Sequence, residues 1–344
     1  MHNNNLKFNI GISLLKIIST ILIVFHHYQQ ITGLRFKNFV NFYGGGVYFG
    51  YIVELFFIIS GFLTYSYISR IKNNEVTFDK FYLKKYLRFY PHIIISIVVY
   101  LIVNYLYKLK FGSYDFIKSI NPLDFLISSV GIQRWGMFKD PGYNNPLWYV
   151  SVLMVCYIVF YFVCYISKKF DINESIMFLL VILIGLYIVN QNINFLFLNT
   201  NIYRGYVAFF IGTLIAGLRS IKINILCLII PIILIAYLFC FPNRNIQYYI
   251  STFVIFPLIV LYFSRINFTS KIFVRAISFF EKYVFCTFVW HAVLLLLYKY
   301  LELPASGHLM IIFTACCWGM GMTYYHLIGT RINKIVKKLN NEGI

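Results

Sequence analysis

The stretch Gly11-Ile-Ser-Leu-Leu-Lys-Ile-Ile-Ser-Thr-Ile-Leu-Ile-Val-Phe-His-His-Tyr28 decides the fold, because it reads as a membrane helix that nevertheless carries a lysine and two histidines. Lys16 and His27 lie eleven positions apart in it. An α-helix turns about 100° per residue, so eleven steps return to within about 20° of the starting direction, roughly 16 Å further along the axis. One helix face therefore carries a cation and an imidazole, and ionisable groups in lipid are costly and usually functional.

The composition extends this interpretation to the whole chain. Of its 344 residues, 60% are hydrophobic and only 12% are charged, with a mean hydropathy of +0.74. Such values exclude a soluble globular domain and predict an all-α, polytopic membrane bundle. Ten spans can be drawn, at about 8–28, 46–68, 90–107, 146–166, 174–190, 203–218, 223–241, 248–263, 283–300 and 308–329. We expect one domain over 1–344 and a retained first helix, since no small-residue cleavage site follows it.

The cations predict the orientation of these spans. With the N-terminus inside, nineteen of the thirty Lys and Arg residues fall on the cytoplasmic side and ten outside. This distribution follows the positive-inside rule and places both termini in the cytoplasm. It also explains the net charge of +19 without a nucleic-acid partner. A long outer loop spans about 108–145, and its apolar segment 123–130 suggests a short amphipathic element on the membrane. The seven cysteines lack metal-like spacing, so we predict packing residues and no metal site.

Each ionisable residue in the first two spans has two interpretations. Lys16 either forms an ion pair with Glu54, the carboxylate in the middle of the second span, or binds an anion in a wet cavity. His27 is either a general base or one of two interfacial histidines near a helix end. Its neighbour His26 is displaced by about 80° around the helix. Ser60 and Gly61 admit close approach of a second helix or of a ligand.

Later segments offer further candidates. Lys84, Lys85 and Arg88 form a cluster suited to phosphate, or to lipid headgroups as a topology anchor. Trp148 follows Asn145-Pro146-Leu147, a pattern typical of a helix start at a membrane interface. His291 in Phe288-Val-Trp-His-Ala292 is a second intramembrane imidazole, either a packing residue or a catalyst.

Together these segments resemble acyltransferase family 3 of integral membrane proteins, whose first helix carries a basic residue, ten intervening residues and a catalytic histidine. Lys16 and His27 match that pattern. The other similar segments are Phe56-Phe-Ile-Ile-Ser-Gly-Phe62, Lys84-Lys85-Tyr-Leu-Arg88-Phe-Tyr-Pro91, Arg204 through Phe209-Phe-Ile-Gly212, and Phe285 through His291. The resemblance covers nearly the whole chain in the family's order.

The chain departs from the family at two positions. Many relatives have Trp-Ser-Leu-x-x-Glu at the fourth span, whereas here Trp148 is followed by Tyr149, and Leu153 stands in place of the carboxylate. Variants of this kind resemble the branch that acts on surface polysaccharides. Lys16 replaces the usual Arg of the first helix.

The resemblance implies an enzyme of the bacterial cytoplasmic membrane that moves an acyl group, usually acetyl, from cytoplasmic acetyl-CoA or another acyl-CoA to a hydroxyl of an envelope polysaccharide or lipid-linked glycan. Lys84, Lys85 and Arg88 would then meet the CoA phosphates, Lys16 would bind the donor deeper in, and His27 would act as general base. Glu54, Ser60, Gly61, Trp148, Arg204 and His291 would support the site. The alternatives are a flippase or transporter of a lipid-linked sugar, and a non-catalytic relative of the same fold; paired broken helices in two matched halves, typical of transporters, are not evident. The sequence predicts neither the acceptor sugar nor an oligomeric state.

Overall fold

The computed structural model describes residues 9–37, 40–191, 193, 195–218, 224–266 and 268–341, and this part of the chain is built of helices without a β-strand. The α-helices are α1 Ile10–Thr32, α2 Ile52–Thr64, α3 Tyr67–Lys72, α4 Phe78–Phe111, α5 Pro122–Val130, α6 Trp148–Lys169, α7 Glu174–Gln191, α8 Ile202–Gly217, α9 Leu226–Cys240, α10 Arg244–Ile250, α11 Phe256–Phe263, α12 Lys271–Glu281, α13 Val284–Tyr300, α14 Gly307–Tyr324 and α15 Thr330–Asn341. Short 3₁₀ segments (η1 Phe49–Tyr51, η2 Asn145–Leu147) and π segments (η4 Ser251–Ile255, η5 Tyr325–Gly329) join some of them.

All ten predicted spans contain a helix, although residues 8 and 223, where two of them begin, lie outside the described residues. Among the described helices, five are long and apolar enough to cross a membrane: Ile10–Thr32, Phe78–Phe111, Asn145–Lys169, Arg244–Phe263 and Gly307–Val336. A sixth crossing results if α12 and α13, bent by 51° at their break, are taken as one. The remaining four are apolar helices shorter than a full span: Phe49–Thr64, Glu174–Val189, Ile202–Gly217 and Leu226–Cys240. The structure thus confirms the helical membrane bundle, with five or six described helices of full membrane length where the sequence predicted ten spans.

The third predicted span, 90–107, is drawn too short. Helix α4 runs over 34 residues from Phe78 to Phe111 and contains Pro91. The basic cluster before Pro91 is therefore helical as well, and it continues the same helix into the region of the predicted cytoplasmic loop. The helix ends at Gly112, whose φ of 81° is a left-handed cap conformation that glycine adopts without strain.

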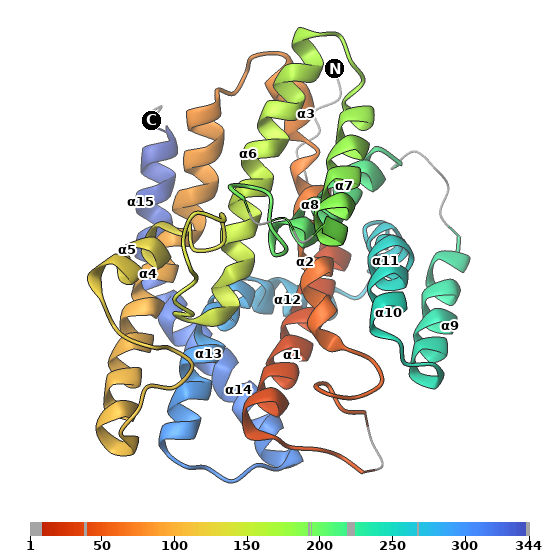
Figure 1. Cartoon of the computed structure of the whole chain (residues 1–344). Coiled ribbons are helices and arrows are strands. Elements are labelled where there is room, and N and C mark those ends of the chain that lie inside the picture. Colours follow the sequence, from red (N-terminus) through yellow and green to blue (C-terminus); the bar gives the residue numbers. More distant parts are fainter. Residues whose placement is uncertain are drawn as a thin grey trace.

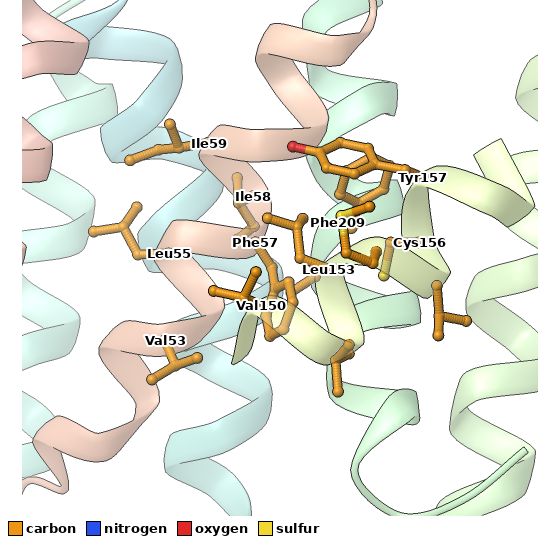
Figure 2. Packing of buried hydrophobic residues seen from close by; sticks show 14 of the residues in the cluster. Val53, Leu55, Phe57, Ile58, Ile59, Val150, Leu153, Cys156, Tyr157 and Phe209 are labelled. Atoms are coloured by element: carbon orange, nitrogen blue, oxygen red, sulfur yellow. The ribbon is translucent and has the colours of Figure 1, made fainter. Parts of the chain in front are cut away.

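Helices α2 and α8 pack with their backbones in direct contact. A Cβ on Gly61 would lie 1.9 Å from the Phe209 carbonyl oxygen, and one on Gly212 would lie 2.1 Å from the Ile58 carbonyl oxygen. The two glycines therefore let the backbones touch from both sides, as small residues do in membrane helix pairs. Figure 2 shows the apolar core beside this contact, where α2, α6 and α8 meet around Phe57.

The segment at about 108–145, predicted to be an outer loop, begins with the end of α4 and then folds back against the bundle. Its middle forms α5, which confirms a helix at the predicted amphipathic segment. Ser151 Oγ donates to the Gly131 carbonyl oxygen at 2.7 Å, and Tyr90 OH donates to the same oxygen at 3.4 Å. These hydrogen bonds from α6 and α4 hold the C-terminal end of α5 against both helices. One side of α5 is therefore covered by protein.

Helices from different parts of the chain lie on opposite sides of the bundle. Figure 1 shows α9, α10 and α11 grouped on one side, with α4, α5 and α15 on the opposite side. Lys16 of α1 and Asn333 of α15 line the same cavity, so the first half of α1 and the start of α15 lie near one another. Gln30 of α1 and Lys299 of α13 line a second cavity near the other end of α1.

Candidate active site

Lys16 is paired, but its partner is Glu281 at the end of α12. The Lys16 Nζ to Glu281 Oε1 distance is 3.1 Å, and the two side chains are 19% and 24% exposed. The alternative ion pair between Lys16 and Glu54 is therefore wrong. The break between α12 and α13 places Glu281 beside α1, and no local sequence signal reports that contact.

Glu54 is instead neutralised by Arg204 of α8. The guanidinium binds the fully buried carboxylate through two bonds of 2.5 and 2.9 Å, and it donates to the Gly50 carbonyl oxygen at 3.3 Å. The same guanidinium lies 4.8 Å from the Trp148 ring centroid, a cation–π contact. A buried carboxylate needs such a partner. These side chains line neither of the two cavities described below. Their place in the structure is to join α2, α8 and the start of α6.

A first cavity of about 430 Å³ opens between α1, α2, α4, α6, α12 and α13, and we call it the inner cavity. Its lining includes four basic side chains and one carboxylate, so basic groups outnumber acidic ones. These are Lys16, Lys85, Arg88, Lys282 and Glu281. Lys84 is exposed and does not line it. The structure therefore brings two of the three clustered cations of α4 to the cavity, together with Lys16.

Lys85 is held over aromatic faces. Its Nζ lies 4.6 Å from the Tyr157 ring centroid, 4.9 Å from that of Tyr67 and 5.6 Å from that of Phe81. Within the described part of the chain, neither Lys85 nor Arg88 has a carboxylate at ion-pair distance. Aromatic faces stabilise a desolvated ammonium without neutralising it. Lys85 therefore lies against aromatic rings in the lining of the inner cavity, where an anion that enters can meet it.

Ser60 and Gly61 separate into two roles. Gly61 faces α8, so the helix-packing interpretation holds for it. Ser60 lines the inner cavity, and its Oγ lies 3.1 Å from Tyr149 OH. Tyr149 OH also donates to the Phe56 carbonyl oxygen at 3.3 Å. Tyr149 is a cavity residue that the sequence did not single out, although it follows Trp148 directly.

His27 lines a second cavity of about 240 Å³, which we call the outer cavity. Its Nδ1 lies 2.9 Å from Gln30 Oε1. An amide oxygen only accepts, so Nδ1 carries the proton and the Nε2 lone pair is free to act as a base. Gln30 sits one helical turn on from His27, a spacing from which the sequence could have proposed it. Asp115 and Lys299, an ion pair at 2.5 Å, line the same cavity.

The two adjacent histidines meet different surroundings. His26 is 2% exposed, and its Nδ1 bonds the Phe42 carbonyl oxygen at 2.8 Å. Its ring also packs edge-on against Tyr43 and Tyr48. His26 therefore fixes the segment after α1 to the helix, whereas the ring of His27 faces α13 and a cavity.

The two cavities share a thin wall on α13. Phe288 lines the inner cavity, and Ala292, about one helical turn later, lines the outer one. Between them His291 is fully buried, and its ring stacks on that of His27 with centroids 5.2 Å apart at 28°. His291 Nδ1 donates to the Phe288 carbonyl oxygen at 2.5 Å, while its Nε2 has no partner among the described residues.

Asn144 completes this wall from the side of α6. It is fully buried, and its Nδ2 donates to Ser96 Oγ and to the Val289 carbonyl oxygen, both at 3.1 Å. Its φ of 47° is left-handed, a conformation that Asn tolerates better than most residues. The sequence Asn144-Asn145-Pro146 gives only a weak indication of this left-handed conformation. Asn144 thereby joins α4, the start of α6 and α13 between the cavities.

No group of three His, Cys, Asp or Glu side chains among the described residues is placed to hold a metal ion. The model of one protein family, described as an acyltransferase domain, matches residues 9–327, which is nearly the whole chain. No curated protein and no solved structure matches the chain. Both cavities lie within the matched range, apart from the α15 residue Asn333 at the rim of the inner one.

Proposed function

The chain belongs to acyltransferase family 3, a family of membrane acyltransferases, and from this premise we propose that it transfers an acyl group from acyl-CoA to a sugar hydroxyl. We further propose that the acyl group is acetyl and that the acceptor is an envelope polysaccharide or lipid-linked glycan. One observation carries the proposal. A cationic inner cavity and an outer cavity that contains His27 meet at a wall only about one helical turn thick. Such an arrangement suits a donor and an acceptor that approach one another from opposite sides.

The inner cavity supports the donor half of the proposal. Phosphate groups favour clustered cations, and the Arg88 guanidinium offers a bidentate fork at the rim. Lys16 lies deeper and is held by Glu281 until a more strongly anionic group displaces that carboxylate. From Lys16 to His27 the helix rises roughly 16 Å, a distance that an extended pantetheine arm can bridge. With Lys16 and Lys85 on the phosphates, the thioester would reach the wall.

The outer cavity supports the acceptor half. In this scheme His27 Nε2 takes the proton of the sugar hydroxyl as its oxygen attacks the thioester carbonyl carbon. The carbon–sulfur bond then breaks, and the leaving thiolate receives the proton from the imidazolium. Gln30 holds the imidazole in the required tautomer throughout. Gln30, Asn145 and Asp115 provide the polar groups that a sugar ring requires.

Radiolabelled acetyl-CoA and glycan acceptors offered to the purified protein in liposomes test this proposal. His27→Ala should lower transfer about 10²–10⁴-fold, the usual contribution of a general base. His308→Ala is the matched control, because His308 is exposed at the start of α14 and lines neither cavity. Full activity of His27→Ala would refute the mechanism. A wild-type protein that moves glycan across the bilayer without forming acetylated product would be a transporter.

The donor site has its own test in acetyl-CoA binding, measured by calorimetry without any acceptor. Lys16→Met keeps the apolar stem of the side chain and removes its charge. We expect weaker acetyl-CoA binding for this variant and for Lys85→Met, and unchanged binding for Lys84→Met, whose side chain lies outside the inner cavity. Unchanged affinity in Lys16→Met would contradict an anchoring role for Lys16.

A further inference from the structure

Three aromatic rings line the inner cavity beside His291, whose ring lies 5.7 Å from that of Phe288. Phe56, Tyr149 and Phe288 all line the cavity, and each ring contacts the other two. The centroid distances are 6.1 Å between Phe56 and Tyr149, 6.3 Å between Phe56 and Phe288, and 5.9 Å between Tyr149 and Phe288. The rings come from α2, α6 and α13, so three helices contribute to one apolar wall. We call these three residues the aromatic triangle.

The triangle lies next to the group proposed to do the chemistry. The carbonyl of Phe288 accepts the hydrogen bond of His291, whose ring stacks on His27. A thioester that enters the inner cavity with its phosphates on the cations therefore meets the triangle as its carbonyl approaches the imidazoles. In that arrangement the acyl tail, which extends beyond the carbonyl, would meet these three rings.

We propose that the aromatic triangle, with Tyr149 as its central member, restricts the donor to short acyl groups. This inference rests on the proposed acyl transfer and goes beyond it by naming a residue that selects the acyl chain. A donor with two or three acyl carbons fits against the rings. A longer chain has to displace at least one of them.

Tyr149 suits this role because it is fixed at both ends. Its hydroxyl contacts Ser60 Oγ at 3.1 Å and the Phe56 carbonyl oxygen at 3.3 Å. Its ring also packs against Phe57, with centroids 4.6 Å apart. A ring held by hydrogen bonds and by packing cannot swing aside for a longer chain at low cost, because protein interiors are close-packed and transmit strain.

The experiment compares kcat/KM for acetyl-, propionyl-, butyryl- and hexanoyl-CoA. One additional methylene in an apolar pocket changes selectivity about 10- to 200-fold, so wild type should disfavour butyryl-CoA at least about 10-fold relative to acetyl-CoA. Tyr149→Ala should reduce the ratio of kcat/KM for acetyl-CoA to that for butyryl-CoA at least about 10-fold, because it opens the wall. Phe56→Leu, which shortens the same wall from α2, should shift the ratio in the same direction.

Two control variants separate the wall from general damage. Tyr149→Phe keeps the ring and loses the hydroxyl, so it should retain most of the discrimination against butyryl-CoA. Tyr157→Ala removes a ring that also lines the inner cavity but lies under Lys85. It should weaken donor binding for all chain lengths and leave their ratio unchanged.

The outcomes also distinguish the two proposals. If wild type transfers no acyl group of any length, the proposed function fails. If it transfers butyryl as readily as acetyl, or if Tyr149→Ala and Phe56→Leu both keep the wild-type ratio, the triangle does not select the donor and acyl transfer still stands. A changed ratio in Tyr157→Ala equal to that in Tyr149→Ala would show that selection is not located at the triangle.

Discussion

Replacing Gly61 by alanine should loosen the backbone contact between α2 and α8. The new Cβ would lie 1.9 Å from the Phe209 carbonyl oxygen and 3.1 Å from the Thr213 backbone nitrogen. Ordinary contact between such atoms needs about 3.5 Å, so α2 and α8 would have to separate by roughly 1.5 Å along that line. Both obstacles are backbone atoms on a packed helix, so no side-chain rotation relieves the clash.

The expected loss of stability comes from the packing contacts that are lost when α2 and α8 separate. A gap of about 0.5–1 Å already forfeits a quarter to a half of the dispersion energy of each atom pair across it. Overpacking of a well-packed core typically costs about 1–3 kcal/mol. Because the obstacle is backbone, we expect Gly61→Ala to lose about 2–3 kcal/mol of the free energy of unfolding.

Gly212 gives this prediction an internal check. Its Cβ would lie 2.1 Å from the Ile58 carbonyl oxygen, so Gly212→Ala should cost a similar amount. Once the helices have separated for one methyl group, the second finds room. The double variant should therefore lose clearly less than the sum of the two single losses, as coupled neighbouring sites do.

The assay is unfolding of the purified protein by SDS in mixed micelles, followed by circular dichroism. Gly319→Ala in α14 is the matched control, because nothing lies within 4 Å of its added Cβ. It should leave stability unchanged or raise it by up to about 1 kcal/mol, the usual gain from removing a helical glycine. Equal SDS midpoints for Gly61→Ala and Gly319→Ala would refute the close backbone contact of α2 and α8.

Two further predictions concern ion pairs. Arg204→Met leaves the Glu54 carboxylate buried without its partner and should lower the free energy of unfolding by about 3–5 kcal/mol in the same assay. Combining it with Glu54→Gln should recover much of that loss. Equal losses in the single and double variants would contradict a buried ion pair. Outside the spans, the hydrogen bond that the Glu174 carboxylate accepts from Lys72 raises the pKa of Lys72. The pair should therefore stabilise the protein below the unfolded pKa of lysine, near 10.4, and lose its effect as the pH rises through the raised folded value. Because the Lys72 side chain is 36% exposed, the effect should stay below about 1 kcal/mol, and melting temperatures of wild type and Lys72→Met should converge at high pH.

Apolar periodicity and length predicted the helices well, because each membrane helix satisfies its own backbone hydrogen bonds and needs no partner to be recognised. All ten predicted spans contain one. Where the helices end was harder to predict. Helix α4 continues through the basic cluster and Pro91, because tertiary neighbours support residues that a hydropathy pattern assigns to a loop.

The site was predictable only within one helix. The spacing of Lys16 and His27 placed both on a common face, and the structure places them at two cavities that share a wall. The ion-pair partners of the charged side chains could not be predicted from local sequence patterns. Choosing Arg204 over Lys16 as the partner of Glu54 requires knowing that α8 packs on α2, and the Lys16–Glu281 contact joins residues 265 positions apart.

Leu153 stands where many relatives carry a carboxylate in the fourth span. Leu153 is 1% exposed in the core shown in Figure 2, among Phe57, Val150 and Cys156, and it lines neither cavity. A carboxylate at this position would be buried without a partner among those apolar neighbours and would destabilise this chain. One turn earlier on α6, Tyr149 lines the inner cavity, and its hydroxyl contacts Ser60 and the Phe56 carbonyl oxygen. The departure therefore concerns the packing of α6 in the core and removes no group from either cavity.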